Sequence, residues 1–176
     1  INSTSSSWGD YDNDGDLDLF VANTGIPGEN NFLYRNEGGG NFTRISSGAI
    51  VNDDGASQGC SWGDYDNDGD LDMFVANQIV FGGEKNFLYQ NNGDGSFTRI
   101  TNGVVADDET DSFGFNWVDY DSDGRLDLFV TSLGLNFLYH NEGNSEFRRI
   151  LTGEIVTDIE PTEGSSWADY DLSLIH

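Results

Sequence analysis

Aspartates at every second position are the residues of this chain best suited to chemistry. Residues 9–20 read Gly-Asp-Tyr-Asp-Asn-Asp-Gly-Asp-Leu-Asp-Leu-Phe, which places five carboxylates within nine residues. The pattern returns near residue 64 and again, with one arginine, near residue 119. The candidate metal ligands are Asp10, Asp12, Asp14, Asp16 and Asp18, then Asp64, Asp66, Asp68, Asp70 and Asp72, then Asp119, Asp121, Asp123, Arg125 and Asp127.

Such crowding of like charges needs a compensating cation. Two charges ~4 Å apart repel by about 1 kcal/mol in water and about 4 kcal/mol at the effective dielectric of a protein surface. Calcium suits these loops, because it takes about 6–8 hard oxygen ligands at alternate loop positions, with a glycine at the sixth for the sharp turn. Gly15, Gly69 and Gly124 occupy that position. The sequence therefore predicts about three Ca²⁺ sites.

The seventh loop position holds Asp16, Asp70 and Arg125. A guanidinium cannot ligate a metal, whereas the seventh position of a calcium loop serves through its main-chain carbonyl. We therefore expect the backbone carbonyl to act at this position in all three loops, so that the third site tolerates its arginine.

Two other interpretations of the loops compete with this one. An EF-hand needs a glutamate at the twelfth position and helices on both sides, but Val21, Val75 and Val130 stand there within strand-like runs. The ninth-position aspartates must then supply the closing carboxylate. A metal-free turn of Gly, Asp and Asn is the second alternative, and the repeated charges in three copies disfavour it.

Composition excludes several classes of partner. The chain has 176 residues, enough for one domain or a piece of a larger one. Its 32 acidic and 7 basic side chains give a net charge of −25, which argues against nucleic acid and anionic membrane surfaces. A hydrophobic fraction of 36% argues against disorder. Without an 18-residue apolar run, no membrane insertion is expected in this segment. Cys60 is predicted to be a small buried strand residue.

An internal repeat sets the fold class. Four tryptophans, Trp8, Trp62, Trp117 and Trp167, are 54, 55 and 50 residues apart, and periods near 50 indicate propellers or stacked arrays. Four short strands are predicted in each complete unit. The expected first strands are 5–8, 59–62, 113–117 and 164–167, the second 17–23, 71–77 and 126–132, and the third 31–36, 86–91 and 136–141; fourth strands begin at Phe42, Phe97 and Phe147.

These strands predict an all-β fold, a β-propeller built from four-stranded antiparallel blades. Within a partial propeller over residues 1–171 we expect three blades, near 3–48, 57–103 and 112–153, and the first strand of a fourth at 163–171. The repeated aromatic residues are expected to form the core between blades. Residues 172–176 leave the pattern and are predicted to be a non-native or truncated tail. The remaining blades of a longer parent chain are expected partners.

The units differ in length only between their second and third strands. In an up-and-down blade those links face away from the Asp loops, and binding sites usually occupy loops on a rigid scaffold. We therefore predict a ligand face at 24–30, 78–85 and 133–135 with the connectors 51–57 and 105–112. Neutral length variation is the alternative.

The motif Trp-Gly-Asp-Tyr-Asp-Asn-Asp-Gly-Asp-Leu-Asp-Leu-Phe-Val-Ala-Asn, followed by Asn-Phe-Leu-Tyr-Arg-Asn, resembles the FG-GAP/VCBS repeats that also build the propeller of integrin α subunits. The likeness is closest to the bacterial branch associated with an ASPIC/UnbV region. It implies an extracellular, secreted or cell-surface propeller, calcium between strands one and two, and adhesion or protein and carbohydrate binding. Asp169 and Asp171 stand alone in the fourth copy and are not expected to hold calcium.

The leading expectation is a calcium-stabilised binding or scaffold module that is not an enzyme, with an extracellular protein or carbohydrate as its ligand. Two alternatives remain open: an accessory propeller of a secreted carbohydrate-active enzyme, and a lectin with sugar pockets between blades. Catalysis by paired carboxylates would need one special pair, whereas these acids recur at the same position in each unit. His140 aligns with Arg35 and Gln90 on an outer strand and is predicted to lie at the surface.

Overall fold

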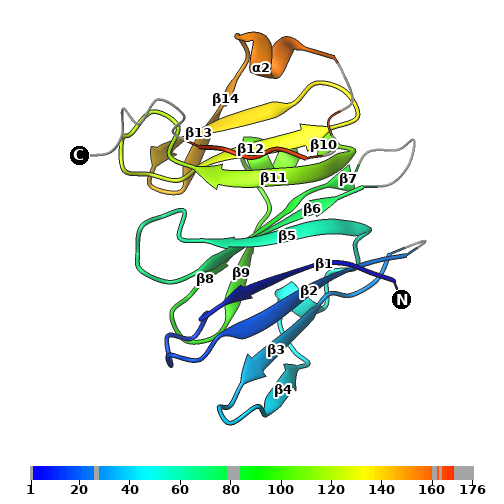
Figure 1. Ribbon diagram of the computed structural model, residues 1–176, viewed down its shortest axis with the longest axis vertical. Coiled ribbons are helices and arrows are strands. Elements are labelled where there is room, and N and C mark those ends of the chain that lie inside the picture. Colours follow the sequence, from blue (N-terminus) through cyan, green and yellow to red (C-terminus); the bar gives the residue numbers. More distant parts are fainter. Residues whose placement is uncertain (1, 26–27, 79–83, 160–161, 163, 169–176) are drawn as a thin grey trace.

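The computed structural model describes residues 2–25, 28–78, 84–159, 162 and 164–168, which form three four-stranded antiparallel sheets (Figure 1). The first sheet contains β1 (Asn2–Gly9), β2 (Asp18–Thr24), β3 (Phe32–Asn36) and β4 (Phe42–Ile45). The second contains β5 (Ser57–Gly63), β6 (Asp72–Asn77), β8 (Phe87–Asn91) and β9 (Phe97–Ile100); the third contains β11 (Ser112–Val118), β12 (Asp127–Ser132), β13 (Phe137–Gly143) and β14 (Glu146–Ile150). The strand order follows the chain in each sheet, which confirms the prediction of propeller-like blades.

The core lies between neighbouring blades. One buried cluster joins the first two sheets and includes Phe20, Leu33 and Met73. A second joins the second and third sheets and includes Phe74, Leu88 and Leu128. Alternate residues of a strand point to opposite faces of its sheet, so the middle strands are buried on both faces. Each blade therefore depends on its neighbour for much of its buried apolar surface.

At each of the two junctions, the tryptophan from the first strand of the following blade lies at the centre. Trp62 is 9% exposed and stacks on Tyr11 of the preceding blade, with ring centroids 6.0 Å apart and an 8° angle between the planes. Trp117 repeats the arrangement on Tyr65 at 6.2 Å and 7°. A Cβ atom on Gly9 would lie 2.6 Å from the Trp62 ring, so the glycine is required for this approach. The predicted inter-blade aromatic core is present at both junctions.

One helical turn follows the last strand of each blade and was not predicted. The turns are η1 (Ala49–Val51), α1 (Val104–Asp107) and α2 (Glu154–Thr157). Ile50, Val105 and Val156 in these turns are buried. Four residues or fewer are too short to produce a helical period in the sequence. The first two turns lie between blades, because η1 contacts β3 and β9 and α1 contacts β8 and β14.

The described parts of the links between second and third strands lie at the right edge of Figure 1, and the Asp loops lie at the left edge. In the first two blades, part of the described link pairs with the next connector. In a two-stranded sheet, β7 (Glu84–Lys85) pairs with β10 (Glu109–Thr110), and Glu29 forms an isolated bridge with Gly55. These segments of the predicted ligand face therefore join adjacent blades. Their role in ligand binding stays a prediction.

Within the expected start of a fourth blade at 163–171, the structure describes residues 164–168. No strand is assigned to residues 164–168, although Trp167 contacts Phe129 edge-on at 5.5 Å, as Trp62 contacts Phe20. Asp169, Asp171 and the 172–176 tail lie outside the described residues. Cys60 is buried as expected, and burial raises the pKa of its thiol to about 11. In the described part of the chain, no helix is long and apolar enough to span a bilayer.

Candidate metal centres

Each Asp loop adopts the same tight backbone turn. The fourth position has a positive φ in every loop, 58° at Asn13, 59° at Asn67 and 63° at Ser122. Asparagine tolerates this left-handed region better than most residues. The sixth-position glycine follows with φ of 95°, 95° and 85°. Two left-handed residues within three positions curl the chain, so that its alternate side chains converge.

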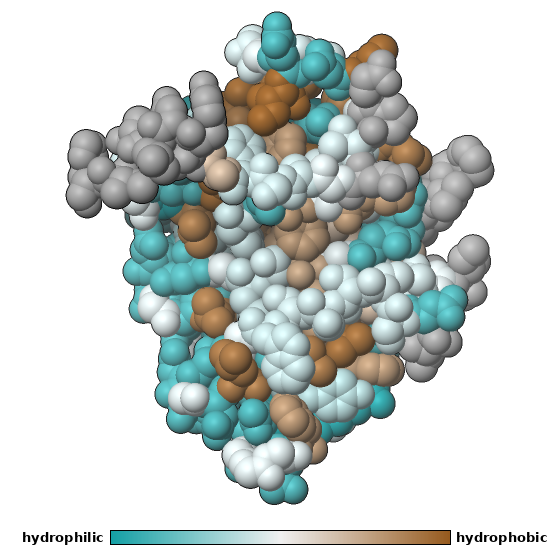
Figure 2. Space-filling view, viewed as in Figure 1, coloured by the Kyte–Doolittle hydropathy of each residue, from teal (hydrophilic) through white to brown (hydrophobic). Residues whose placement is uncertain are grey.

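The first, third and ninth aspartates of each loop converge on one point. Their carboxylate oxygens lie within 4.8 Å of one another in three clusters. The clusters are Asp10, Asp12 and Asp18; Asp64, Asp66 and Asp72; and Asp119, Asp121 and Asp127. Three carboxylates at this separation form an oxygen-rich site able to hold a metal ion. In Figure 2 the surface along the left edge, where these loops lie, is mostly hydrophilic.

The ninth-position aspartate is the buried anchor of each loop. Asp18 is 0% exposed, and its two oxygens accept hydrogen bonds from the backbone N–H groups of Tyr11 at 3.1 Å and Asn36 at 2.8 Å. Asp72 and Asp127 make the same pair of bonds in the other blades. This carboxylate therefore ties the loop to the third strand, besides facing the cluster.

Burial makes these carboxylates costly to ionise without a cation. It raises the pKa of Asp72 to about 7, with the charge of Asp66 adding to the effect and two backbone N–H bonds opposing it. The pKa values of Asp18 and Asp127 are also raised, chiefly by burial. At the third position, burial and then the neighbouring aspartate raise the pKa of Asp12 and Asp66.

The fit to a hard cation is supported by two orphaned oxygens. Asp12 Oδ1 and Asp66 Oδ1 are buried and have no hydrogen-bond partner. A buried oxygen without a partner carries a desolvation cost of about 1–3 kcal/mol. Both orphans belong to the converging clusters, and a cation bound there would satisfy them.

The fifth and seventh positions behave differently from the other three. Asp14 and Asp68 each accept the backbone N–H of the seventh residue at 2.9 Å, which braces the turn. The Asp16 side chain is exposed, and Asp70 Oδ1 accepts a hydrogen bond from Asn13 of the preceding blade at 2.6 Å. Neither seventh-position aspartate belongs to the converging clusters. Ligation through the main-chain carbonyl at this position stays a prediction.

The third loop carries its own basic group. The Arg125 guanidinium pairs with the Asp123 carboxylate, and Arg125 Nε donates to the carbonyl of Asn141 at 2.7 Å. The arginine replaces one negative charge of the loop with a positive one. The third site is therefore less anionic than the other two.

One residue of the third strand faces each Asp loop, an arrangement not predicted from the sequence. Gln90 Nε2 donates to Asp66 Oδ2 at 2.6 Å. His140 was predicted to lie at the surface, but it is 8% exposed, and its Nδ1 faces Asp121 and Asp127. The prediction was wrong because β13 is not an outer strand: it pairs with β12 and β14, and its His140 lies beneath the Asp loop of its own blade. The sequence signal for this arrangement was that Arg35, Gln90 and His140 align at one position of the third strand.

The asparagine that ends each third strand fastens the loops together. Asn91 Nδ2 donates to the carbonyl of Tyr11 in the preceding blade at 2.8 Å and to that of Leu71 at 3.1 Å. Asn141 repeats this with Tyr65 at 2.7 Å and Leu126 at 3.0 Å. The first and second loops are thus each held by an asparagine of their own blade and by one of the next blade.

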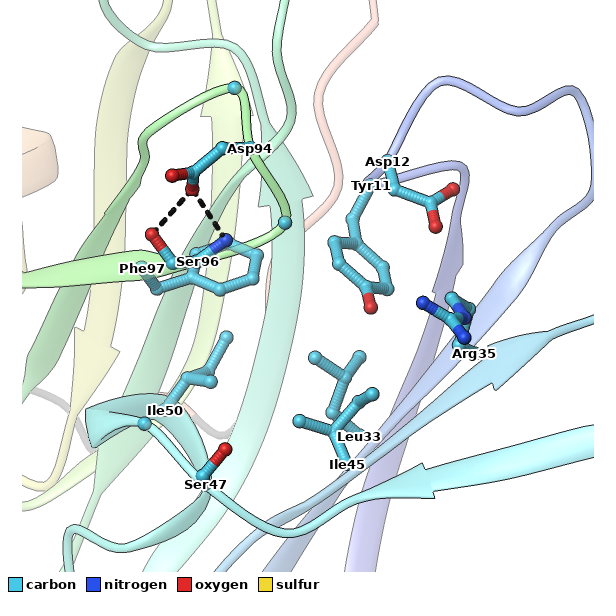
Figure 3. A pocket seen from close by; sticks show the side chains of 13 residues that line it. Tyr11, Asp12, Leu33, Arg35, Ile45, Ser47, Ile50, Asp94, Ser96 and Phe97 are labelled. Atoms are coloured by element: carbon cyan, nitrogen blue, oxygen red, sulfur yellow. Dashed lines mark hydrogen bonds between the residues drawn. The ribbon is translucent and has the colours of Figure 1, made fainter.

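Cavities also open between blades, away from the predicted ligand face. A cavity of about 470 Å³ lies between the first two sheets, where Leu33 and Ile45 face Phe97 (Figure 3). Asp12 and Arg35 border it on one side. A cavity of about 390 Å³ occupies the next junction and is lined by Leu88, Ile100, Val104 and Phe147 among others. Recurrence at both junctions marks these spaces as features of blade packing.

Comparison with known families agrees with the repeat seen in the structure. A family model described as FG-GAP-like repeat matches residues 4–75, 77–130 and 119–172, which together cover most of the chain. The predicted link to the ASPIC/UnbV branch is not confirmed by this match. No curated protein matches the chain.

Proposed function

Because the chain belongs to the FG-GAP-like repeat family, we propose that it is a calcium-stabilised binding or scaffold module of a secreted or cell-surface protein. The observation that carries the proposal is the convergence of three aspartates in every repeat. In two of the three repeats, one carboxylate oxygen of this cluster is buried without a hydrogen-bond partner. Bound calcium would supply the positive charge that offsets carboxylate repulsion in the loops. The first-, third- and ninth-position aspartates would hold it.

The chain's own residues explain why the metal would matter for stability. Each ninth-position aspartate connects its loop to strand three, and each third-strand asparagine of the second and third blades connects two loops. Relief of repulsion in one loop would therefore stabilise a junction between blades as well as a turn. Binding free energy of this kind adds directly to folding free energy.

The proposal describes a module without catalytic activity of its own. The acidic groups recur at equivalent positions in three blades, whereas a reaction needs one distinct arrangement of acid and base. An extracellular protein or a carbohydrate is the proposed ligand. The inter-blade cavities support the lectin alternative, since the first one combines apolar walls with Asp12 and Arg35. Glycan binding that persists in an Asp10→Asn variant, which alters the proposed metal cluster and leaves the cavity lining intact, would favour that alternative.

Calcium titration by isothermal calorimetry at two pH values tests the proposed function. At pH 8 we expect binding with dissociation constants on the order of 10⁻⁴–10⁻³ M, the range of extracellular calcium modules. At pH 6 the second loop should bind about tenfold more weakly, because the Asp72 carboxyl has a pKa of about 7 and must lose its proton first. The raised pKa means that protons compete with calcium below pH 7 and no longer compete above it.

Magnesium at the same concentrations is the matched control, since it demands near-octahedral geometry and gives up its water reluctantly. Equal heats for the two ions would indicate nonspecific screening of the −25 net charge. An absence of calcium binding at pH 8 would overturn the proposed function.

A further inference from the structure

The third loop differs from the other two in the atom that it leaves without a partner. Among the atoms that face the three carboxylate clusters, the buried atoms without a partner are carboxylate oxygens at the first and second loops, Asp12 Oδ1 and Asp66 Oδ1. At the third cluster the atom without a partner is a nitrogen, His140 Nδ1. The His140 residue is more than nine-tenths buried. A buried imidazole nitrogen directed at carboxylates is a different donor set from an all-oxygen loop.

The position of this nitrogen matches a transition-metal site. His140 Nδ1 lies 3.2 Å from Asp127 Oδ1 and 3.4 Å from Asp121 Oδ2, yet it forms no hydrogen bond. Ligands of a tetrahedral zinc ion at bond lengths of about 2.0–2.1 Å stand about 3.3 Å apart. Ligand atoms of Asp121, Asp123 and His140 also lie within 4.8 Å of one another. The separations are those of groups that share one small cation.

The donor atoms of the third loop point in the same direction. Arg125 pairs with Asp123 and lowers the negative charge of the loop for any divalent cation, so the choice of metal depends on the donor atoms. Imidazole nitrogen suits zinc and related divalent transition metals, whereas carboxylate and carbonyl oxygen suit calcium and magnesium. Gln90 at the equivalent position of the second blade donates a hydrogen bond to Asp66 and offers no such nitrogen.

We propose that the third Asp loop is a mixed nitrogen and oxygen site for a zinc-class divalent cation, with His140 Nδ1, Asp121 and Asp123 as its protein ligands. This proposal depends on the proposed function only in its premise that the acidic loops hold cations. Asp127, whose Oδ1 lies 3.2 Å from His140 Nδ1, is held beside the site by its two backbone hydrogen bonds. Calcium would occupy the first two loops in preference to the third.

The test uses the untagged full chain and titrates it with Zn²⁺, and with Co²⁺ as a spectroscopic probe of tetrahedral nitrogen and oxygen ligation. The unmodified chain should bind one zinc ion tightly. His140→Gln, which installs the residue of the second blade, should weaken zinc binding by at least about tenfold, because even outer-shell changes cost 10–100-fold. Calcium binding at the first two loops should not change in this variant.

His176→Gln is the control, because the chain has only two histidines. Zinc binding that survives His140→Gln, or that is lost in His176→Gln, would overturn the proposed site, and so would a chain that binds no zinc.

If His140→Gln does not fold, the Gln90→His variant decides the question. Binding of a second zinc ion by this variant supports the proposal, and an unchanged number of bound zinc ions contradicts it. Loss of calcium binding with retained zinc binding would instead contradict the proposed function alone.

Discussion

A Trp62→Ala variant should lose about 3–5 kcal/mol of unfolding free energy, the usual cost of removing a buried aromatic side chain. The Trp62 ring stacks on Tyr11 and packs at a tilt against Phe97, with ring centroids 6.0 Å apart in both pairs. It also contacts Phe20 edge-on, with centroids 6.1 Å apart. Its indole N–H also donates to the carbonyl of Ser7 at 3.2 Å. The substitution would therefore open a cavity in the junction between the first two blades. Urea unfolding followed by tryptophan fluorescence and circular dichroism measures the change.

Trp8→Ala is the matched control within the same chain. Trp8 occupies the equivalent strand position but is 55% exposed, with Phe42 as its ring partner at 6.1 Å. In the described residues no tyrosine stacks on it as Tyr11 stacks on Trp62. We expect Trp8→Ala to cost less than about 1 kcal/mol. Equal losses for the two variants would contradict a core that lies between blades.

Replacement of Asp18 by alanine is expected to lower the free energy of unfolding by about 2–6 kcal/mol even without calcium. The substitution leaves the backbone N–H groups of Tyr11 and Asn36 without their acceptor, and each such group costs about 1–3 kcal/mol when buried. The variant should also lose the calcium response of the first loop. Unfolding curves recorded in calcium and in a chelator separate the two effects.

Asp16→Ala changes the same loop two residues earlier and serves as the control. The Asp16 side chain is exposed, and the predicted ligand at this position is the main-chain carbonyl. Its stability should stay within about 0.5 kcal/mol of the parent chain, and most of the calcium response should remain. If Asp16→Ala abolished the response while Asp18→Ala preserved it, the assignment of ligands to loop positions would be wrong.

The sequence predicted what depends on local periodicity. The strands around Phe20, Phe74 and Phe129 appear where alternating and β-branched residues indicated them, because their period of two is a property of neighbouring residues. The convergence of Asp10, Asp12 and Asp18 was likewise foreseeable, since residue spacing and a glycine fix that turn.

Contacts between distant residues could not be predicted in this way. The hydrogen bond from Asn91 to the carbonyl of Tyr11 joins residues 80 apart, and nothing in either segment indicates the partner. His140 was misplaced because strand order alone does not say which side chain lies beneath a loop. The single helical turns are too short to produce a hydrophobic period in the sequence. In the described residues 164–168, Trp167 makes the ring contact seen in the other blades, but these residues do not form a strand.

Thermal unfolding of the full chain in calcium and in a chelator tests the central claim most directly. A site adds about 1.4 kcal/mol when calcium is tenfold above its dissociation constant, so the first two loops together should add about 3 kcal/mol. A chain of this length should then melt about 6–12 °C higher in calcium than in chelator, while magnesium produces a smaller rise. An unchanged midpoint at calcium concentrations up to about 10 mM would contradict the account.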